Sequence, residues 1–253
     1  MESKVTGSGK PIILLHEWLG DHRNWLPMLR YCPTDEFAFH CLDLPGYGMS
    51  QDIAKTPSIE AIAELVLNYA SERKLEKFAL VAHSMSGLVA HHLGVVAPQT
   101  LADLIFFCPV PPNGFKATED GIAAMHSVAT RRDALRDAIL VRGGEFESDE
   151  WVDEKVDLAW SASEPEVKKA HLEMFLAPVH PVPQKSTLRR AKIIGGEVDL
   201  PFYQEASLRN EFQPYYGEIE VDGLAKCGHY PMLQDPKLSA NVLLECLKTP
   251  IFP

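Results

Sequence analysis

Basic runs and long apolar stretches are both missing from this sequence of 253 residues. No run of Lys or Arg is longer than two residues, and the formal net charge is −11 at pH 7. Nucleic acids and anionic membrane surfaces bind basic faces, so we expect neither as a partner. No segment approaches the ~18 uninterrupted apolar residues of a transmembrane helix, so we also expect no membrane span.

Cysteine is scarce, and its spacing shows no pairing. The cysteines are Cys32, Cys41, Cys108, Cys227 and Cys246. Their odd number and the absence of a CxxC pair argue against a disulfide framework and a structural zinc site. The opening segment, MESKVTGSGK, lacks the apolar core of a signal peptide, so we expect a cytoplasmic protein. Among the histidines there is no HExxH spacing, and we expect no metal site.

What the sequence does contain is an alternation of short apolar runs with longer amphipathic stretches. We predict strands at 11–16, 37–44, 77–83, 101–108, 191–196 and 216–223. Helical spacing of apolar residues marks 58–74, 86–97 and 236–248. This alternation predicts an α/β fold with a mostly parallel central sheet and helices on both faces. In such a sheet the carboxyl ends of the strands share one edge, where ligand sites collect.

One long segment departs from this alternation. Residues 112–189 offer no convincing strand and instead contain helical patterns at 118–141, 148–162 and 164–176. Proline-rich stretches, PVPPNG and PVHPVPQK, bound the segment on both sides. We therefore predict a core formed by 1–111 and 190–253, with 112–189 inserted as a helical cap over the strand ends.

The run AHSMSG, residues 82–87, follows a buried strand and opens a helix. A nucleophilic serine at such a turn needs small residues two positions before and after it, and Ala82 and Ser86 meet that requirement around Ser84. The amide of Met85 would then point toward negative charge that develops beside the serine oxygen. A helix N-cap is the competing interpretation of Ser84, and this motif alone leaves both open.

A serine nucleophile needs a base and an orienting acid. His229, in AKCGHYPMLQDP, follows the last predicted strand, and Asp199, in IIGGEVDLP, follows the strand before it. Glu197 is the weaker candidate for the acid. The chain order serine, aspartate, histidine, each at a strand end, is that of one known architecture.

These segments together resemble the α/β-hydrolase fold, over roughly 10–111 and 190–250. The stretch LLHEWLGDHRNW resembles the family's oxyanion loop, DLPGYGMS its Asp-x-Pro-Gly-x-Gly-x-Ser turn, and CGHYPMLQDP its histidine loop. The resemblance implies Ser84 as nucleophile, His229 as base, Asp199 as orienting acid, and the amides of Trp18 and Met85 as the oxyanion hole. Glu17 departs from the family, which usually has glycine there.

The resemblance implies a serine hydrolase acting on a small to medium, largely apolar ester or lactone, without a cofactor. Carbon–carbon bond hydrolysis, cofactor-free ring-opening dioxygenation and non-catalytic binding of a small molecule are the alternatives on this fold. For substrate binding we nominate His16, Trp18, Met125 and Trp160. Met125 and Trp160, together with Trp151, Met174 and Phe175, could equally form the packing of the cap itself.

Overall fold

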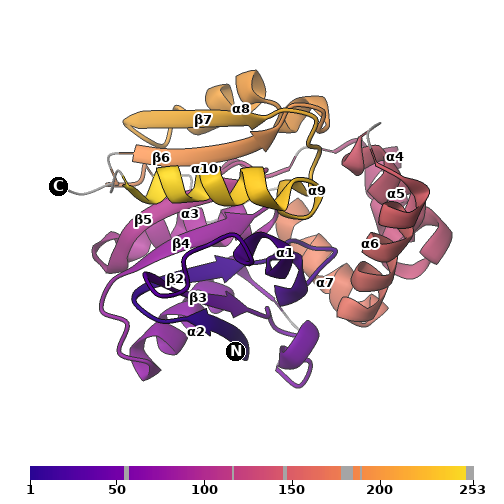
Figure 1. Ribbon diagram of the computed structural model, residues 1–253. Helices are drawn as coiled ribbons and strands as arrows, with labels where there is room; N and C mark the ends of the chain where they lie inside the picture. The colour runs from indigo at the N-terminus through magenta and orange to yellow at the C-terminus, as the bar shows by residue number, and fades with distance from the viewer. Residues whose placement is uncertain (54–56, 116, 145–146, 178–184, 189, 249–253) are drawn as a thin grey trace.

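The computed structural model describes residues 1–53, 57–115, 117–144, 147–177, 185–188 and 190–248. Within these residues, seven strands form one sheet in the order β1-β3-β2-β4-β5-β6-β7 (Figure 1). The strands are β1 Ser3–Gly7, β2 Lys10–Leu15, β3 Phe37–Leu42, β4 Phe78–His83, β5 Leu101–Phe107, β6 Arg190–Gly196 and β7 Glu218–Leu224.

All strand pairs are parallel except one. β1 pairs antiparallel with β3, whereas β3, β2, β4, β5, β6 and β7 run parallel to one another. In the centre of the sheet, Ile13 lies opposite His40 on one side and Leu80 on the other. The predicted mostly parallel α/β fold is confirmed, and β1 is the strand that the sequence patterns did not reveal.

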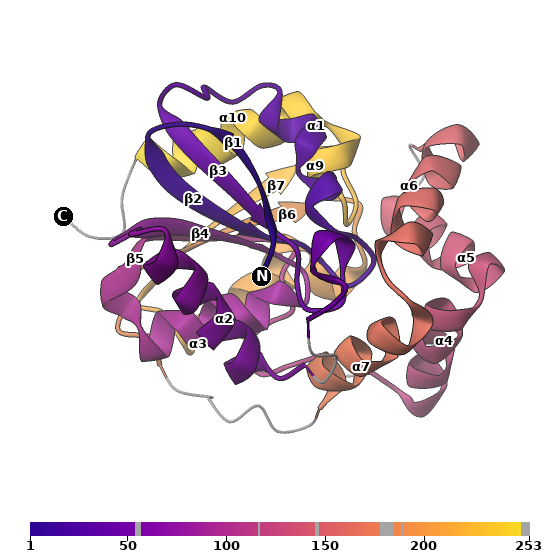
Figure 2. The same ribbon diagram turned by 90° about the horizontal axis from the view of Figure 1, so that it is seen from below.

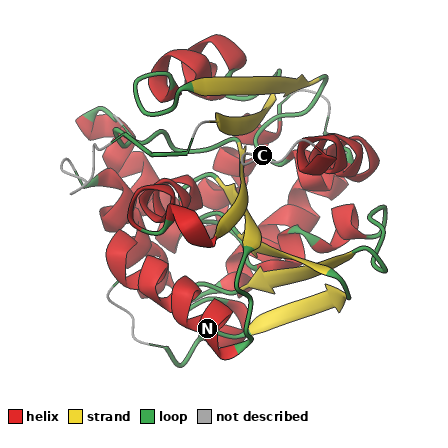
Figure 3. Ribbon diagram, turned by 90° about the vertical axis from the view of Figure 1, so that its left-hand side faces the viewer, coloured by secondary structure: helices red, strands yellow, loops and turns green. Residues whose placement is uncertain are grey.

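Alternate residues of each buried strand face opposite helical layers. Ile12 and Leu14 pack with apolar residues of α1 and α10, while Ile13 and Leu15 pack with residues of α2 and α3. Figure 2 shows α1 and α10 on one side of the strands and α2 and α3 on the other, and Figure 3 shows the twist of the sheet between them. Apolar residues on both faces of a strand therefore mark burial inside a covered sheet.

Three helices of the core lie close to the predicted ranges, namely α2 Ile59–Glu72, α3 Ser86–Val96 and α10 Pro236–Lys248. The shorter helices α1 Leu26–Leu29, α8 Glu205–Phe212 and α9 Pro231–Gln234 were not predicted. Ser58 caps α2, because its side chain accepts a hydrogen bond from the amide of Ala61. No described helix combines the length and the apolarity needed to cross a bilayer.

Among the described residues between β5 and β6, four helices gather on one side of the sheet (Figure 1). They are α4 Glu119–Thr130, α5 Arg132–Gly143, α6 Asp149–Ala162 and α7 Pro165–Leu176. The predicted helix at 118–141 is in fact two helices, because Arg131 has extended backbone. A continuous helix would turn Arg132 into the stripe of Val128 and Leu135, whereas the break leaves it exposed. The predicted boundary at 189 lies outside the described residues.

Candidate active site

The turn between β4 and α3 holds Ser84 in a strained conformation. Its φ is +53°, a left-handed value that side chains other than glycine rarely adopt. The amide of Ser84 donates to the carbonyl of Phe107 at 3.0 Å, and its carbonyl accepts from Val110 at 2.9 Å. A Cβ on Gly87 would lie 2.9 Å from Pro109, so the following helix can pass this close only with glycine there. The strain and close packing fit a nucleophile turn rather than an ordinary N-cap.

The structure brings the three predicted catalytic side chains together. Nε2 of His229 lies 2.9 Å from the hydroxyl oxygen of Ser84, and Nδ1 lies 2.7 Å from Oδ2 of Asp199. All three residues are buried, although they are separated by as many as 145 positions in the chain. Such a chain of hydrogen bonds can move a proton from the hydroxyl to the imidazole while the carboxylate holds the ring.

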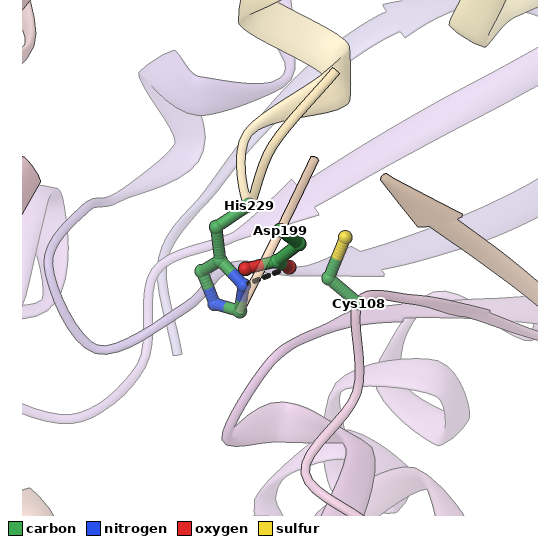
Figure 4. A group of neighbouring side chains, drawn as sticks. All are labelled: Cys108, Asp199 and His229. Carbon is green, nitrogen blue, oxygen red and sulfur yellow. Dashed lines mark hydrogen bonds and ion pairs between the residues drawn. The ribbon is translucent and has the colours of Figure 1, made fainter. Parts of the chain in front are cut away.

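Asp199 lies between the imidazole of His229 and the thiol of Cys108, as Figure 4 shows. Its second oxygen accepts a hydrogen bond from the amide of Leu200 at 2.7 Å. Burial and the Asp199 charge raise the pKa of the Cys108 thiol well above its usual range. Asp199 therefore has hydrogen-bond support on both carboxylate oxygens, from His229 and from Leu200.

The backbone of His229 is fixed from two directions. Its amide donates to the carbonyl of Arg142 at 2.8 Å, and its carbonyl accepts a hydrogen bond of 2.7 Å from Nε2 of His83. A Cβ on Gly228 would lie 2.2 Å from the same Arg142 carbonyl, so the histidine loop packs directly against the end of α5. The tertiary structure thereby sets where the imidazole stands.

The loop after β2 lies beside Ser84 and is held by side chains on several sides. Nε2 of His16 accepts from the amide of Leu44 at 3.0 Å, so its Nδ1 donates to the carbonyl of Glu17 at 2.7 Å. The Ser86 hydroxyl donates to the carbonyl of His16 and ties this loop to the serine turn. The hydroxyl of Tyr47 donates to the Trp18 carbonyl at 2.9 Å.

Where the loop after β2 meets the serine turn, two backbone amides have no hydrogen-bond acceptor among the described residues. Among the hydrogen bonds of the described residues, neither the N–H of Trp18 nor that of Met85 donates to a protein acceptor. Both residues are buried, and buried amides without a partner are rare in folded proteins. Such amides beside Ser84 are available to a ligand oxygen.

Glu17 and Lys155 form a buried ion pair that joins this loop to α6. Oε1 of Glu17 lies 2.9 Å from Nζ of Lys155, which also donates to the carbonyl of Leu19 at 2.6 Å. The amide of Leu19 in turn donates to Oε2 of Glu17. Burial raises the pKa of Glu17, but the charge and hydrogen bond of Lys155, the His83 charge and the Leu19 amide together outweigh burial and lower that pKa to about 2. The carboxylate of Glu17, at a position where the family usually has glycine, is thus ionised and holds the loop after β2 against α6.

A small cavity of about 20 Å³ lies over Ser84, and we call it the Ser84 cavity. It is lined by Glu17, Trp18, Leu19, Ser84, Phe115, Met125, Arg142, Phe175, Phe202, Tyr203 and His229. Two nominated substrate-binding residues, Trp18 and Met125, are among them. A volume of this size admits about one water molecule, so a substrate requires the inserted helices or side chains to move.

The other two nominated substrate-binding residues, His16 and Trp160, do not line this cavity. His16 is fully buried outside the cavity lining, and both of its ring nitrogens are engaged by backbone groups. Trp160 is 36% exposed and likewise does not line the cavity. The sequence identifies the chemical type of such residues but not the direction in which each side chain points.

Tyr203 and Arg142 are cavity residues that the sequence patterns did not single out. The ring of Tyr203 lies 4.4 Å from that of His229. Burial and the Asp199 charge raise the pKa of Tyr203 above its usual range, while the Arg142 charge and a hydrogen bond with Ser84 oppose them. Only the position of Tyr203, four residues after Asp199, could have hinted at its place in the site.

A second cluster of possible metal ligands is formed by Asp21, His22 and Asp43. Asp43 accepts hydrogen bonds from Nδ1 of His22 at 2.8 Å and from the amides of His22 and Met49. The guanidinium of Arg23 binds Asp21 at 2.7 Å. Because these donors and acceptors already satisfy one another, the cluster is explained as the framework of the turn that contains Asp43.

A much wider groove of about 1000 Å³ lies at the opposite edge of the sheet, where the strands begin. Lys10, Phe37 and Lys77 line it together with residues of α10. Catalytic sites of open α/β sheets lie at the carboxyl ends of the strands. The smaller Ser84 cavity is therefore the candidate active site.

Because His83 and His171 are buried, we predict that the folded protein becomes less stable in mild acid. Burial lowers the pKa of His83 to about 3 and that of His171 to about 4, from an ordinary 6.5. Because the unfolded chain binds these protons first, the stabilisation is complete above pH 6.5 and is lost as the pH falls toward 4. Each histidine contributes a slope of about 1.4 kcal/mol per pH unit.

Urea unfolding of the wild-type protein and of His171→Gln, at several pH values from 7 down to 5, measures this slope. Glutamine can keep the 3.0 Å hydrogen bond to the Pro45 carbonyl without titrating. We expect the free energy of unfolding to depend less steeply on pH in the variant, by about 1.4 kcal/mol per unit below pH 6. Equal slopes in the two proteins would show that His171 titrates normally.

The sheet and its covering helices have the architecture of an α/β hydrolase, and a comparison with protein families agrees. The profile of the alpha/beta hydrolase family matches residues 12–242. The chain therefore belongs to the alpha/beta hydrolase family.

Individual relatives are more distant. The chain is 30% identical over 112 residues to the pimeloyl-[acyl-carrier protein] methyl ester esterase of Pseudoalteromonas atlantica, covering 44% of this chain and 42% of that protein. It is 25% identical to the protein of that name from Nitrosospira multiformis, over 94% of each chain. Among solved structures, a bromoperoxidase from Bacillus anthracis is similar, with a TM-score of 0.82, 18% identity, and 98% and 95% of the two chains covered. At that identity the likeness shows the fold alone.

Proposed function

We propose that this protein is a serine hydrolase that cleaves a carboxylic ester or lactone through an acyl-enzyme. The single observation that carries the proposal is the continuous hydrogen-bonded line from Ser84 through His229 to Asp199, at 2.9 and 2.7 Å. A hydroxyl is a weak nucleophile unless a base takes its proton, and this line supplies one. The esterases similar to this chain support the same reaction class.

In the proposed reaction, Ser84 attacks the ester carbonyl while Nε2 of His229 accepts its proton. Asp199 remains ionised, holds the imidazole in one tautomer and stabilises the imidazolium. His229 then returns the proton to the departing alkoxide, which leaves an acyl group on Ser84. Water activated by the same imidazole attacks the acyl-enzyme and releases the acid.

The amides of Trp18 and Met85 are proposed to bind the oxyanion of each tetrahedral intermediate. The unpaired state of these N–H groups supports this role, because a preformed oxyanion hole needs donors that the protein does not use itself. Each donor in comparable sites contributes about 3 kcal/mol to stabilising the transition state. The ion pair of Glu17 and Lys155 fixes the loop that carries the Trp18 amide.

The lining of the Ser84 cavity favours a small to medium acyl group with apolar character. Its aromatic walls come from Trp18, Phe115, Phe175 and Phe202. Because the cavity is almost closed, we propose that the inserted helices act as a cap that opens for substrate and then excludes water. A small-molecule substrate and a cytoplasmic location remain predictions from the sequence.

A panel of p-nitrophenyl esters of graded acyl length, with lactones and vinylogous diketones, tests the function. We expect turnover of short and medium esters or of lactones, with kcat/KM falling for long acyl chains. Turnover confined to the diketones would replace ester hydrolysis by carbon–carbon bond cleavage. Binding without turnover of any member would favour a small-molecule receptor, and oxygen uptake with a ring-opened product would favour a dioxygenase.

A further inference from the structure

Arg142 lies in the last turn of α5 and lines the Ser84 cavity. Its guanidinium has one hydrogen bond among the described residues, a 3.3 Å contact from Nη1 to the carbonyl of Ala138 in its own helix. No described carboxylate forms an ion pair with it. A half-buried cation beside a nucleophile, without an anion of its own, is an unusual charge to maintain.

The two buried carboxylates of the site each have a partner other than Arg142. Glu17 is neutralised by Lys155 at 2.9 Å, and the carboxylate of Asp199 bonds Nδ1 of His229 at 2.7 Å. The positive charge of Arg142 acts on the interior, because it lowers the pKa of Tyr203 and Tyr230 against the dominant effect of burial, which raises both. Among the described residues that line the cavity, Arg142 is a cation that forms no ion pair of its own.

The backbone of Arg142 is tied to the catalytic loop. Its carbonyl accepts the amide of His229 at 2.8 Å, and the side-chain amide of Gln234 donates to the carbonyl of Gly143 at 2.7 Å. The backbone from which the Arg142 side chain extends is therefore fixed beside the proposed base. Such fixed placement suits recognition of a second group on the substrate.

We propose that Arg142 binds a carboxylate of the substrate, so that the ester or lactone is an anionic one whose carboxylate lies away from the bond that breaks. A guanidinium matches a carboxylate through two parallel hydrogen bonds. Of the two oxyanions bound in this way, the planar carboxylate suits a small cavity better than the larger phosphate. This inference rests on the proposed hydrolase function and adds the chemical class of its substrate.

Matched ester pairs test the proposal on both sides of the scissile bond. On the acyl side the pair is p-nitrophenyl hydrogen glutarate and p-nitrophenyl pentanoate, and on the leaving side it is p-acetoxybenzoate and p-acetoxybenzamide. We expect wild-type enzyme to prefer the anionic member of at least one pair, mainly through a lower KM. In Arg142→Gln the ratio of kcat/KM values, anionic over neutral, should fall about 10- to 100-fold, and Arg142→Lys should recover part of it.

Arg132→Gln is the matched control, because Arg132 lies on the same helix, is exposed and pairs with Asp157 on the surface. This control should keep the wild-type ratio. If Arg142 serves only the end of α5, its replacement will lower the melting temperature and leave the ratio unchanged, which overturns the proposal. Equal rates on both members of both pairs in the wild type also overturn it, although ester hydrolysis itself then stands.

A binding measurement keeps the inference testable if none of these esters is turned over or if a variant unfolds. Glutarate, glutaramide and inorganic phosphate are titrated into wild-type protein, and the melting temperature is followed. We expect glutarate to raise it, and the Ser84→Ala protein to respond in the same way, since the carboxylate site does not need the hydroxyl. A response to phosphate alone, or equal responses to glutarate and glutaramide, would contradict a carboxylate site.

Discussion

Replacing Ser84 with alanine will lower kcat on the best ester by a factor on the order of 10⁴ to 10⁶. Within the proposed triad, only the hydroxyl oxygen of Ser84 forms a covalent bond with the substrate. This oxygen lies 2.9 Å from Nε2 of His229. Without it, the oxyanion hole and the binding energy still assist attack by water, so a small residual rate should remain. Steady-state kinetics on the purified variant measures the loss.

Two further proteins make this result specific. Ser71→Ala, which changes an exposed serine of α2, should keep wild-type kinetics. The double variant Ser84→Ala, His229→Ala should lose no more activity than Ser84→Ala alone, because the two groups act as a unit. Full turnover by Ser84→Ala would contradict the serine mechanism and leave a reaction led by His229.

Replacing Lys155 with methionine will destabilise the fold by about 3–5 kcal/mol, because it leaves the Glu17 carboxylate buried without its partner. Both side chains are nearly inaccessible to solvent, at 1% and 3%. The loss should also lower kcat, since Glu17 accepts the amide of Leu19 and so fixes the loop that carries the Trp18 N–H. Urea unfolding and ester kinetics measure the two effects.

A double-mutant cycle separates the ion pair from general packing. Glu17→Gln combined with Lys155→Met should be more stable than Lys155→Met alone, because no buried charge is left unpaired. As a control, Lys169→Met removes an exposed lysine that pairs with Glu166, and it should cost less than about 1 kcal/mol. Equal losses of stability in the Lys155 and Lys169 variants would mean that the buried ion pair contributes no more to stability than the exposed one.

Much of the fold was predictable because burial leaves a plain record in the sequence. Strands covered on both faces, such as β4, are continuous apolar runs, and their predicted ends lie within two residues of the observed ones. β1 escaped notice because Ser3–Gly7 is a short, largely exposed edge strand with little apolar pattern. The break between α4 and α5 keeps Arg132 out of the apolar stripe, and the spacing of apolar residues used to predict the helix does not take this charged side chain into account.

The central side chains of the candidate site were predictable for a topological reason. In a parallel sheet the strand ends meet at one edge, so Ser84, Asp199 and His229 could be matched by chain order together with the resemblance of their segments to the family's motifs. Their separations of 30 and 145 positions were no obstacle to this argument.

The surroundings of the triad were not predictable in the same way. Lys155 reaches Glu17 across 138 positions, and no spacing rule connects a residue of α6 to the loop after β2. The backbone contacts that engage His16, and the docking of α5 that brings Arg142 to the cavity, also arise only in the folded chain. Such contacts depend on how the inserted helices sit against the sheet.

Covalent labelling tests the central claim most directly. The protein is treated with a fluorophosphonate, and the adduct is located by peptide mass spectrometry in wild type, His229→Ala and Ser84→Ala. An activated hydroxyl at residue 84 should yield one adduct there, form it far more slowly once the imidazole is gone, and give none in the alanine protein. An adduct on a different residue, or no adduct in a preparation that hydrolyses esters, would contradict the account.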